Sequence, residues 1–293
     1  MQERSFFDQH GVEVFTYWWT VPEPRGNVVI SHGASEHGAR YDRFARALSA
    51  AGYSAFAIDH RGHGRTAAST GQGKMGPGGG EAVLDDLHEL RTQAEAESGA
   101  GVPTFLFSHS MGSIFGLAYL TKHSAGLAAG VLCGFPSDPN GAAAMKELMQ
   151  GLVDAGMGEQ SFDGLRNTNA NEDARTPYDW LSRDDAEVDK YIADPMCGDD
   201  NPLTYGYIAE FIDMAVVGAE NLSAIQCPVF VIAGDQDPTG ANGVHPTALA
   251  DQLKAAGVAT DLKLYAGARH ELLNDTNRDE VTADLIAWFD SKL

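Results

Sequence analysis

Short apolar runs alternate with amphipathic segments along most of the chain. The runs are rich in β-branched and aromatic residues and are bounded by glycine, proline or polar loops, as buried strands are. The segments between them repeat apolar residues at helical spacing, which is typical of helices that bury one face. We expect strands over Val12 to Trp18, Asn27 to Ser31, Ser54 to Ile58, Thr104 to Phe107, Gly130 to Gly134, Pro228 to Ala233 and Asp261 to Tyr265. We expect helices over Tyr41 to Leu48, Val83 to Leu90, Met111 to Tyr119, Pro246 to Ala256 and Asp279 to Phe289.

This alternation predicts an α/β fold with a mostly parallel central sheet, because each strand–helix–strand unit makes a right-handed crossover. The alternation stops between residues 136 and 217, where two helical apolar stripes replace it. Within that stretch, residues 172–200 hold ten acidic side chains and only three basic ones. We therefore expect a core domain formed by residues 1–135 and 218–293, with residues 136–217 inserted as a mostly helical cap.

Composition excludes several classes of function. The chain has 293 residues and a formal net charge of −21, so nucleic acids and anionic membrane surfaces would repel it. The three cysteines are odd in number and widely spaced, which does not indicate a disulfide framework. No apolar stretch is long enough to cross a bilayer, and the N-terminus lacks a signal-peptide core. We expect a cytoplasmic protein without integral membrane association; the sequence leaves its oligomeric state open.

A strand that turns directly into a helix carries the first chemical signal. The apolar run ending at Phe107 is followed by Ser108-His-Ser-Met-Gly112, with Ser110 at the turn. This is the pattern of a nucleophile elbow, in which small residues flank a strained serine because strand and helix pass close together. The usual motif is G-x-S-x-G, and Ser108 replaces its first glycine. By itself, the segment also fits a serine that caps an ordinary helix.

Two further strand ends carry the partners that a serine nucleophile needs. A serine hydroxyl becomes reactive when an imidazole accepts its proton and a carboxylate orients that imidazole. In elbow enzymes the acid and then the histidine follow the serine along the chain. Asp235 and Asp237 come after the strand that ends at Ala233, and His270 follows the one that ends at Tyr265. Each has an ordinary structural explanation, but together they predict a catalytic triad.

An oxyanion hole requires two backbone N–H groups, one from the residue after the nucleophile and one from an earlier loop. Met111 supplies the first by position. The loop after the strand ending at Ser31 begins His32-Gly-Ala34, so Ala34 is expected to supply the second. A simple glycine turn would explain the glycine of this loop but not the polar residues that follow it.

Four motifs resemble those of a known family. They are His32-Gly-Ala-Ser-Glu-His-Gly-Ala-Arg40-Tyr41, Asp59-His-Arg-Gly-His-Gly64, Ser108-His-Ser-Met-Gly112 and Arg269-His-Glu-Leu-Leu-Asn274. They look like monoacylglycerol lipases and bacterial lysophospholipases of the α/β-hydrolase fold, and Pro177 to Asp184 and Tyr191 to Gly198 extend the resemblance into the cap.

The resemblance implies roles for individual residues. It assigns the nucleophile to Ser110, the base to His270 and the acid to Asp237, and the oxyanion donors to Ala34 and Met111. It implies that Glu36 and Arg40 bind the alcohol part of the substrate, although these two could equally form a local ion pair. The chain departs from the family at Ser108 and at Leu273, where glyceride lipases can carry a polar residue.

We therefore expect a serine carboxylester hydrolase that cleaves small or lipid-like esters of the monoacylglycerol type through an acyl-enzyme on Ser110. It needs no cofactor, and the clustered histidines of the early loops match no zinc spacing. A lysophospholipase, a promiscuous esterase, an aminopeptidase on the same scaffold and a non-catalytic ligand receptor are the alternatives.

Overall fold

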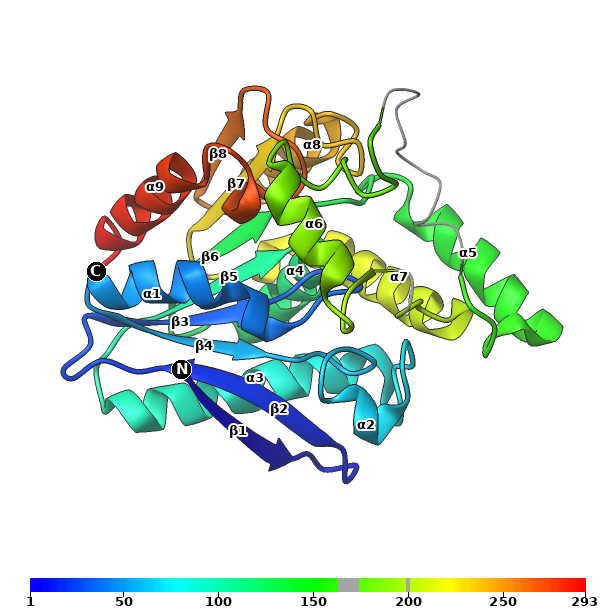
Figure 1. Cartoon of the computed structure of the whole chain (residues 1–293), viewed down its shortest axis with the longest axis horizontal. Helices are drawn as coiled ribbons and strands as arrows, with labels where there is room; N and C mark the ends of the chain where they lie inside the picture. The colour runs from blue at the N-terminus through cyan, green and yellow to red at the C-terminus, as the bar shows by residue number, and fades with distance from the viewer. Residues whose placement is uncertain (163–173, 199–200) are drawn as a thin grey trace.

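One eight-stranded sheet runs through the molecule (Figure 1). The computed structural model describes residues 1–162, 174–198 and 201–293. The strands are β1 (Gln2–Phe7), β2 (Glu13–Trp19), β3 (Gly26–Ser31), β4 (Tyr53–Ile58), β5 (Thr104–His109), β6 (Leu127–Cys133), β7 (Val229–Gly234) and β8 (Thr260–Tyr265). Their order across the sheet is β1-β2-β4-β3-β5-β6-β7-β8. The β1–β2 and β2–β4 pairings are antiparallel and all the others are parallel, so the predicted mostly parallel sheet is confirmed.

Helices cover both faces of this sheet. The α-helices of the described residues are α1 (Asp42–Ala50), α2 (Ala67–Thr70), α3 (Gly79–Ser98), α4 (Met111–His123), α5 (Ala142–Leu152), α6 (Asp185–Ala193), α7 (Tyr205–Glu220), α8 (Val244–Ala255) and α9 (Arg278–Asp290). Apolar side chains of α1 and α9 pack with those of one sheet face, and those of α3, α4, α7 and α8 belong to the core of the other face.

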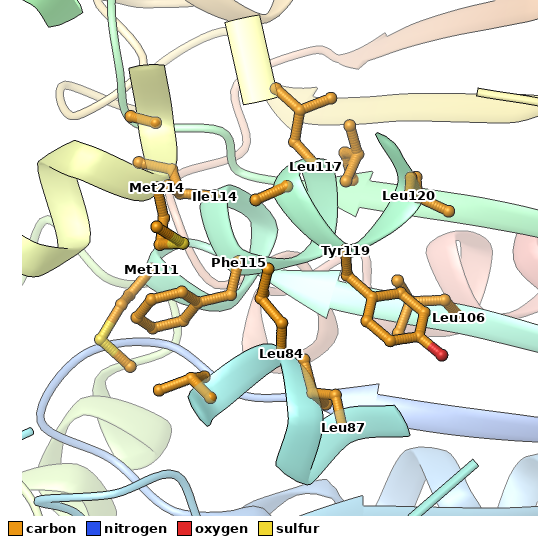
Figure 2. Close-up of a cluster of buried hydrophobic side chains, with 14 of the residues drawn as sticks. Leu84, Leu87, Leu106, Met111, Ile114, Phe115, Leu117, Tyr119, Leu120 and Met214 are labelled. Atoms are coloured by element: carbon orange, nitrogen blue, oxygen red, sulfur yellow. The ribbon is translucent and has the colours of Figure 1, made fainter. Parts of the chain in front are cut away.

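The central strand β5 shows why the chain folds in this way. Its side chains alternate, so Phe105 and Phe107 enter the core shared with α1 and α9, whereas Leu106 enters the opposite core. Figure 2 shows that second core, in which Ile114 and other side chains of α4 lie between those of α3 and Met214 of α7. A strand buried on both faces is apolar at nearly every position, which is why β5 was predictable.

The segment between β6 and β7 contains α5, α6 and α7. Helix α7 lies along α4 and contributes Met214 and Ala215 to the core that Figure 2 shows. Helix α5 packs beside α7 at the right-hand end of Figure 1. Part of the predicted cap, residues 163–173 and 199–200, lies outside the described residues. In the part of the chain that the structure describes, no helix has the length and apolar character required to cross a bilayer.

Strand β1 and helices α2 and α6 were not predicted from the sequence. Strand β1 has few apolar residues, because it lies at the edge of the sheet and most of its side chains are exposed. Helix α6 lacks a clear apolar stripe, but it carries a recognisable N-terminal signal: the Asp184 side chain accepts a hydrogen bond from the N–H of Ala186 at 3.0 Å.

Candidate active site

Ser110 stands at a strained turn between β5 and α4. Its backbone angles are φ 54° and ψ −120°, in the left-handed half of conformational space that residues other than glycine rarely adopt. The turn is held in place because the N–H of Ser110 donates to the carbonyl of Cys133 at 2.9 Å and the Ser113 hydroxyl donates to the carbonyl of Ser110 at 2.6 Å. A Cβ at Gly112 would collide with the carbonyl oxygens of Ser31 and His32, so α4 and the end of β3 approach closely here. This geometry matches a nucleophile elbow.

The structure accommodates the serine that replaces the usual first glycine of the elbow. Ser108 is fully buried, and its hydroxyl donates to the carbonyl of Val131 on β6 at 2.8 Å. Gly116 on α4 faces it: a Cβ built at Gly116 would lie 2.8 Å from Ser108 Cβ and closer still to Ser108 Oγ. The absence of a side chain on the helix therefore provides the space that Ser108 occupies on the strand.

The three side chains that the sequence pointed to lie in one hydrogen-bonded line. His270 Nε2 is 2.8 Å from Ser110 Oγ, and His270 Nδ1 is 2.8 Å from Asp237 Oδ2. The three residues follow the carboxyl ends of β5, β7 and β8, which meet at one edge of the sheet because the strands are parallel. Since a carboxylate accepts the hydrogen bond at Nδ1, the proton of the neutral imidazole lies there, and Nε2 is free to accept one from the serine.

Asp235, the alternative acid, points elsewhere. Its Oδ1 accepts the backbone N–H of Gly267 at 2.7 Å and so braces the loop after β8. Asp237 is fully buried, and a residue that sequence reasoning missed holds it. The N–H and hydroxyl of Thr239 both donate to Asp237 Oδ1, at 3.0 and 2.8 Å, and the same hydroxyl oxygen lies 3.0 Å from His270 Nδ1. A threonine two residues after an aspartate is a common local turn, which is the signal that could have found it.

The surroundings of His270 adjust its basicity. Burial lowers its pKa, but the negative charge and hydrogen bond of Asp237 outweigh that effect, so the pKa lies above its ordinary value. The rings of Trp180 and His109 pack against the imidazole, with centroids 5.0 and 4.8 Å away. Burial, with a smaller contribution from His270, lowers the pKa of His109 to about 4, so His109 is neutral near pH 7 and adds no competing charge.

The loop after β3 lies against Ser110. A Cβ at Gly33 would be 3.1 Å from Ser110 Cβ and 2.8 Å from Glu36 Oε1, so only glycine fits at this position. This closeness places Ala34, the next residue, beside the elbow. Met111 is the first residue of α4, where the N–H groups of a helix have no partner within the helix. Both expected oxyanion donors therefore flank Ser110 in the chain or in space.

Glu36 and Arg40 form the ion pair that the sequence left open as an alternative to substrate binding. Glu36 Oε2 accepts from Arg40 at 2.6 Å, and its Oε1 accepts from Gly33 N–H at 2.6 Å and from the Tyr41 hydroxyl at 2.9 Å. Arg40 also donates two hydrogen bonds to the Glu271 carboxylate, at 2.6 and 2.8 Å. The network joins the loop after β3 to the residue that follows His270. Contact of Glu36 and Arg40 with substrate stays a prediction.

Comparisons with known proteins identify the family of the chain. Residues 22–277 match the protein family described as serine aminopeptidase, S33. The chain belongs to this family. It is 30% identical to a monoacylglycerol lipase of Mycolicibacterium smegmatis, in an alignment that covers 99% of this chain and 98% of that protein. It is 25% identical to the human monoglyceride lipase, over 87% of this chain and 78% of the human protein.

The solved structures give the same result. A thermostable carboxyl esterase from Bacillus coagulans, in complex with glycerol, superposes with a TM-score of 0.90 at 32% identity, covering 99% of this chain and 98% of that one. The S33 hydrolase therefore has the α/β-hydrolase fold and is a carboxylic ester hydrolase, as the motifs predicted. The resemblance to monoacylglycerol lipases is likewise confirmed.

An open recess of about 370 Å³ adjoins the site of the S33 hydrolase. Its lining includes Glu36, Arg40, His109, Glu271 and Leu273, but neither Ser110 nor His270. The recess is therefore lined by neighbours of Ser110 and His270 and not by these two side chains themselves. Leu273 gives it an apolar wall at the position where the family can carry a polar one.

One side-chain group has the composition of a metal site. The ligand atoms of His37, Asp194 and Cys197 all lie within 4.8 Å of one another. However, His37 Nε2 and Asp194 Oδ2 are 2.9 Å apart, a hydrogen-bond distance, whereas ligand atoms around a tetrahedral zinc ion are separated by about 3.4 Å. Burial raises the pKa of the Cys197 thiol, which disfavours the thiolate that a metal requires. We therefore interpret the group as a hydrogen-bonded contact between the loop after β3 and the turn after α6.

Proposed function

We propose that this S33 hydrolase cleaves neutral monoacylglycerol-type esters through an acyl-enzyme on Ser110. The observation that carries the proposal is the line of two 2.8 Å hydrogen bonds from Ser110 through His270 to Asp237, with the serine raised on a strained turn. An ordinary helix-capping serine would have neither the left-handed backbone nor an imidazole aligned with its hydroxyl.

The reaction follows from this arrangement. Ser110 Oγ attacks the ester carbonyl carbon while His270 Nε2 accepts its proton, and Asp237 stabilises the imidazolium through Nδ1–H. The oxyanion that forms accepts hydrogen bonds from the backbone N–H groups of Ala34 and Met111. The tetrahedral intermediate collapses as His270 donates its proton to the alcohol oxygen, which leaves an acyl ester on Ser110. Water, deprotonated by His270, then releases the carboxylic acid by the same route.

Charge and relatives support the substrate class. The relatives reported above are two monoglyceride lipases and a carboxyl esterase, and that esterase was solved in complex with glycerol. A net charge of −21 would repel anionic lipid surfaces and disfavours phospholipids as substrates. We include in the proposal that residues 136–217 form a cap through which substrate enters, and that Glu36 and Arg40 contact its alcohol group.

A labelling experiment tests the mechanism and a substrate panel tests the specificity. A fluorophosphonate should modify wild-type protein at Ser110 alone, as mass spectrometry of the peptides would show. Labelling elsewhere, or none, would overturn the acyl-enzyme proposal. An aminoacyl p-nitroanilide serves as the control for peptidase activity, and we expect no turnover of it.

The panel compares a neutral monoacylglycerol with lysophosphatidylglycerol at low and high salt. We expect kcat/KM to favour the neutral ester at low salt, and the difference to narrow near 1 M salt, where the Debye length is about 3 Å. A preference for the anionic lipid at low salt would show that local positive groups outweigh the overall charge, and lysophospholipase would then be the better description.

A further inference from the structure

The loop that carries the expected oxyanion donor Ala34 is held by a hydrogen bond to a buried side chain. The N–H of Gly33, one residue earlier, donates to Glu36 Oε1 at 2.6 Å. Because Glu36 is itself buried, this bond holds the His32–Gly33 peptide in place. The next peptide along the chain carries the Ala34 N–H. The loop cannot simply move toward the nucleophile either, since a single Cβ at Gly33 would already press on Ser110.

The same loop is fastened from outside by the segment that contains α6. The carbonyl of Ser35 accepts the Tyr191 hydroxyl at 3.0 Å and the backbone N–H of Gly198 at 3.1 Å. The Ser35 hydroxyl in turn donates to the carbonyl of Asn201 at 3.2 Å. The residues on both sides of Ala34 are thus held, one by the core and one by the α6 segment.

Ser35 depends on these outer bonds more than an ordinary loop residue would. Its φ is +53°, a left-handed conformation that side-chain-bearing residues rarely adopt. Strained backbone of this kind persists only where the surroundings hold it in place. When a donor to the Ser35 carbonyl is lost, the Ser35–Glu36 peptide gains freedom to rotate. Changes in the backbone angles of Ser35 and Ala34 then carry this movement to the Ala34 N–H, which lies two peptide units earlier.

The environment of Tyr191 keeps its hydroxyl protonated and in place as a hydrogen-bond donor. The side chain is buried, and burial raises the pKa of its hydroxyl well above the ordinary value, so it keeps its proton. The guanidinium of Arg40 lies over the ring, 4.8 Å from its centroid. Arg40 is in turn bound to Glu271, next to His270 in the chain. The ring therefore packs against the network that links the two loops of the site.

We propose that Tyr191 is a positioning residue, which aims the Ala34 N–H at the oxyanion by holding the Ser35 carbonyl. In this view the α6 segment contributes to the reaction rate and does more than cover the substrate. The inference rests on the proposed function, in which that N–H stabilises the tetrahedral intermediate.

The test is Tyr191→Phe, which deletes the donor oxygen and keeps the ring. The Ser35 carbonyl retains the bond from Gly198, so no buried acceptor is left without a partner and the variant should fold. The matched control is Tyr53→Phe. Tyr53 is fully buried and its hydroxyl donates to Asp290 at 2.6 Å, but it lies at the amino end of β4, away from the site edge of the sheet.

Three quantities are measured for each protein: kcat and KM on esters with two different alcohols, and the dissociation constant of an alkyl boronic acid, whose tetrahedral adduct mimics the intermediate. Loss of a whole oxyanion donor costs about 10²- to 10³-fold in kcat, so a misaimed donor should cost less. For Tyr191→Phe we expect kcat to fall about 3- to 30-fold for both esters, boronic acid binding to weaken by a similar factor, and KM to change less than about twofold.

Three results would overturn the inference. They are an unchanged kcat, an increase in KM for one alcohol only, which would make Tyr191 a substrate contact, and an equal loss of kcat in Tyr53→Phe, which would make the effect one of stability. Fluorophosphonate labelling separates this failure from a failure of the proposed function. If Ser110 is labelled and Tyr191→Phe turns over like the wild type, only the positioning role fails. If Ser110 of the wild type is not labelled, the proposed function fails and this inference with it.

Discussion

The close contact between Ser108 and Gly116 makes a sharp prediction about the elbow. Gly116→Ala would place a methyl 2.8 Å from Ser108 Cβ and 3.4 Å from Leu132 Cδ2, and closer still to Ser108 Oγ. Ser108 Oγ cannot easily move aside, because it is buried and bonded to the carbonyl of Val131 at 2.8 Å. Helix α4 would have to move away from β5, and Ser110, which joins the two elements, would move with it.

The expected size of the effect follows from two opposing terms. Overpacking a filled core costs about 1–3 kcal/mol, whereas alanine is favoured over glycine inside a helix by about 1 kcal/mol. In the wild-type background, Gly116→Ala should therefore lower the free energy of unfolding by about 1 kcal/mol. In a Ser108→Gly background the obstruction is absent and only the helical term remains, so the same substitution should raise the free energy of unfolding by about 1 kcal/mol. The coupling between the two sites is then about 2 kcal/mol.

Urea unfolding of the wild type, the two single variants and the double variant measures this coupling, and the rate of fluorophosphonate labelling reports the position of Ser110. We expect slower labelling in Gly116→Ala and partial recovery in the double variant. The reasoning would be refuted if Gly116→Ala stabilised the wild type, or if the two effects added to within about 0.5 kcal/mol, as they do for independent sites.

Three further predictions concern the hydrogen-bonded line. Ser110→Ala should lower kcat by about 10⁴-fold or more while urea unfolding stays cooperative, and residual activity above about a thousandth of wild type would indicate another nucleophile. Asp237→Asn should lower kcat by about 10⁴-fold, as the same change does in a serine protease, because an amide leaves the histidine in the wrong tautomer; Asp235→Asn should cost far less, and the reverse order would show that Asp235 is the acid. The reaction needs neutral His270, whose pKa is raised above 6.5 mainly by Asp237 against the opposing effect of burial, so kcat/KM should fall as the pH drops through a midpoint above 6.5. A midpoint below 6.5 in the pH profile would contradict this.

Much of the fold was predictable because it depends on local patterns. Strands buried on both faces must be apolar, and helices on the sheet must be amphipathic, so the order of elements could be read directly from the chain. The elbow was predictable for a related reason, since a tight strand-to-helix turn restricts the size of the residues around Ser110. Edge strand β1 was not predictable, because a strand with one partner and an exposed face does not have to be apolar.

The partners of each polar group depended on the tertiary structure instead. Asp235 and Asp237 stand two residues apart on one loop, and only the packing of β7 against β8 decides that the second faces His270 while the first bonds to Gly267. The sequence motifs left Glu36 and Arg40 as either substrate ligands or a local ion pair, and only the tertiary structure brings Glu271 to Arg40 as a second carboxylate partner.

The contact between Tyr191 and Ser35 joins residues 156 positions apart, and no local pattern encodes it. Local patterns were enough to specify which elements form and which strand ends carry the polar side chains of the site, because backbone geometry and side-chain burial act over a few residues at a time. The tertiary structure decided which of those groups meet, because hydrogen bonds and charges act at distances of a few ångströms in space, whatever the separation along the chain.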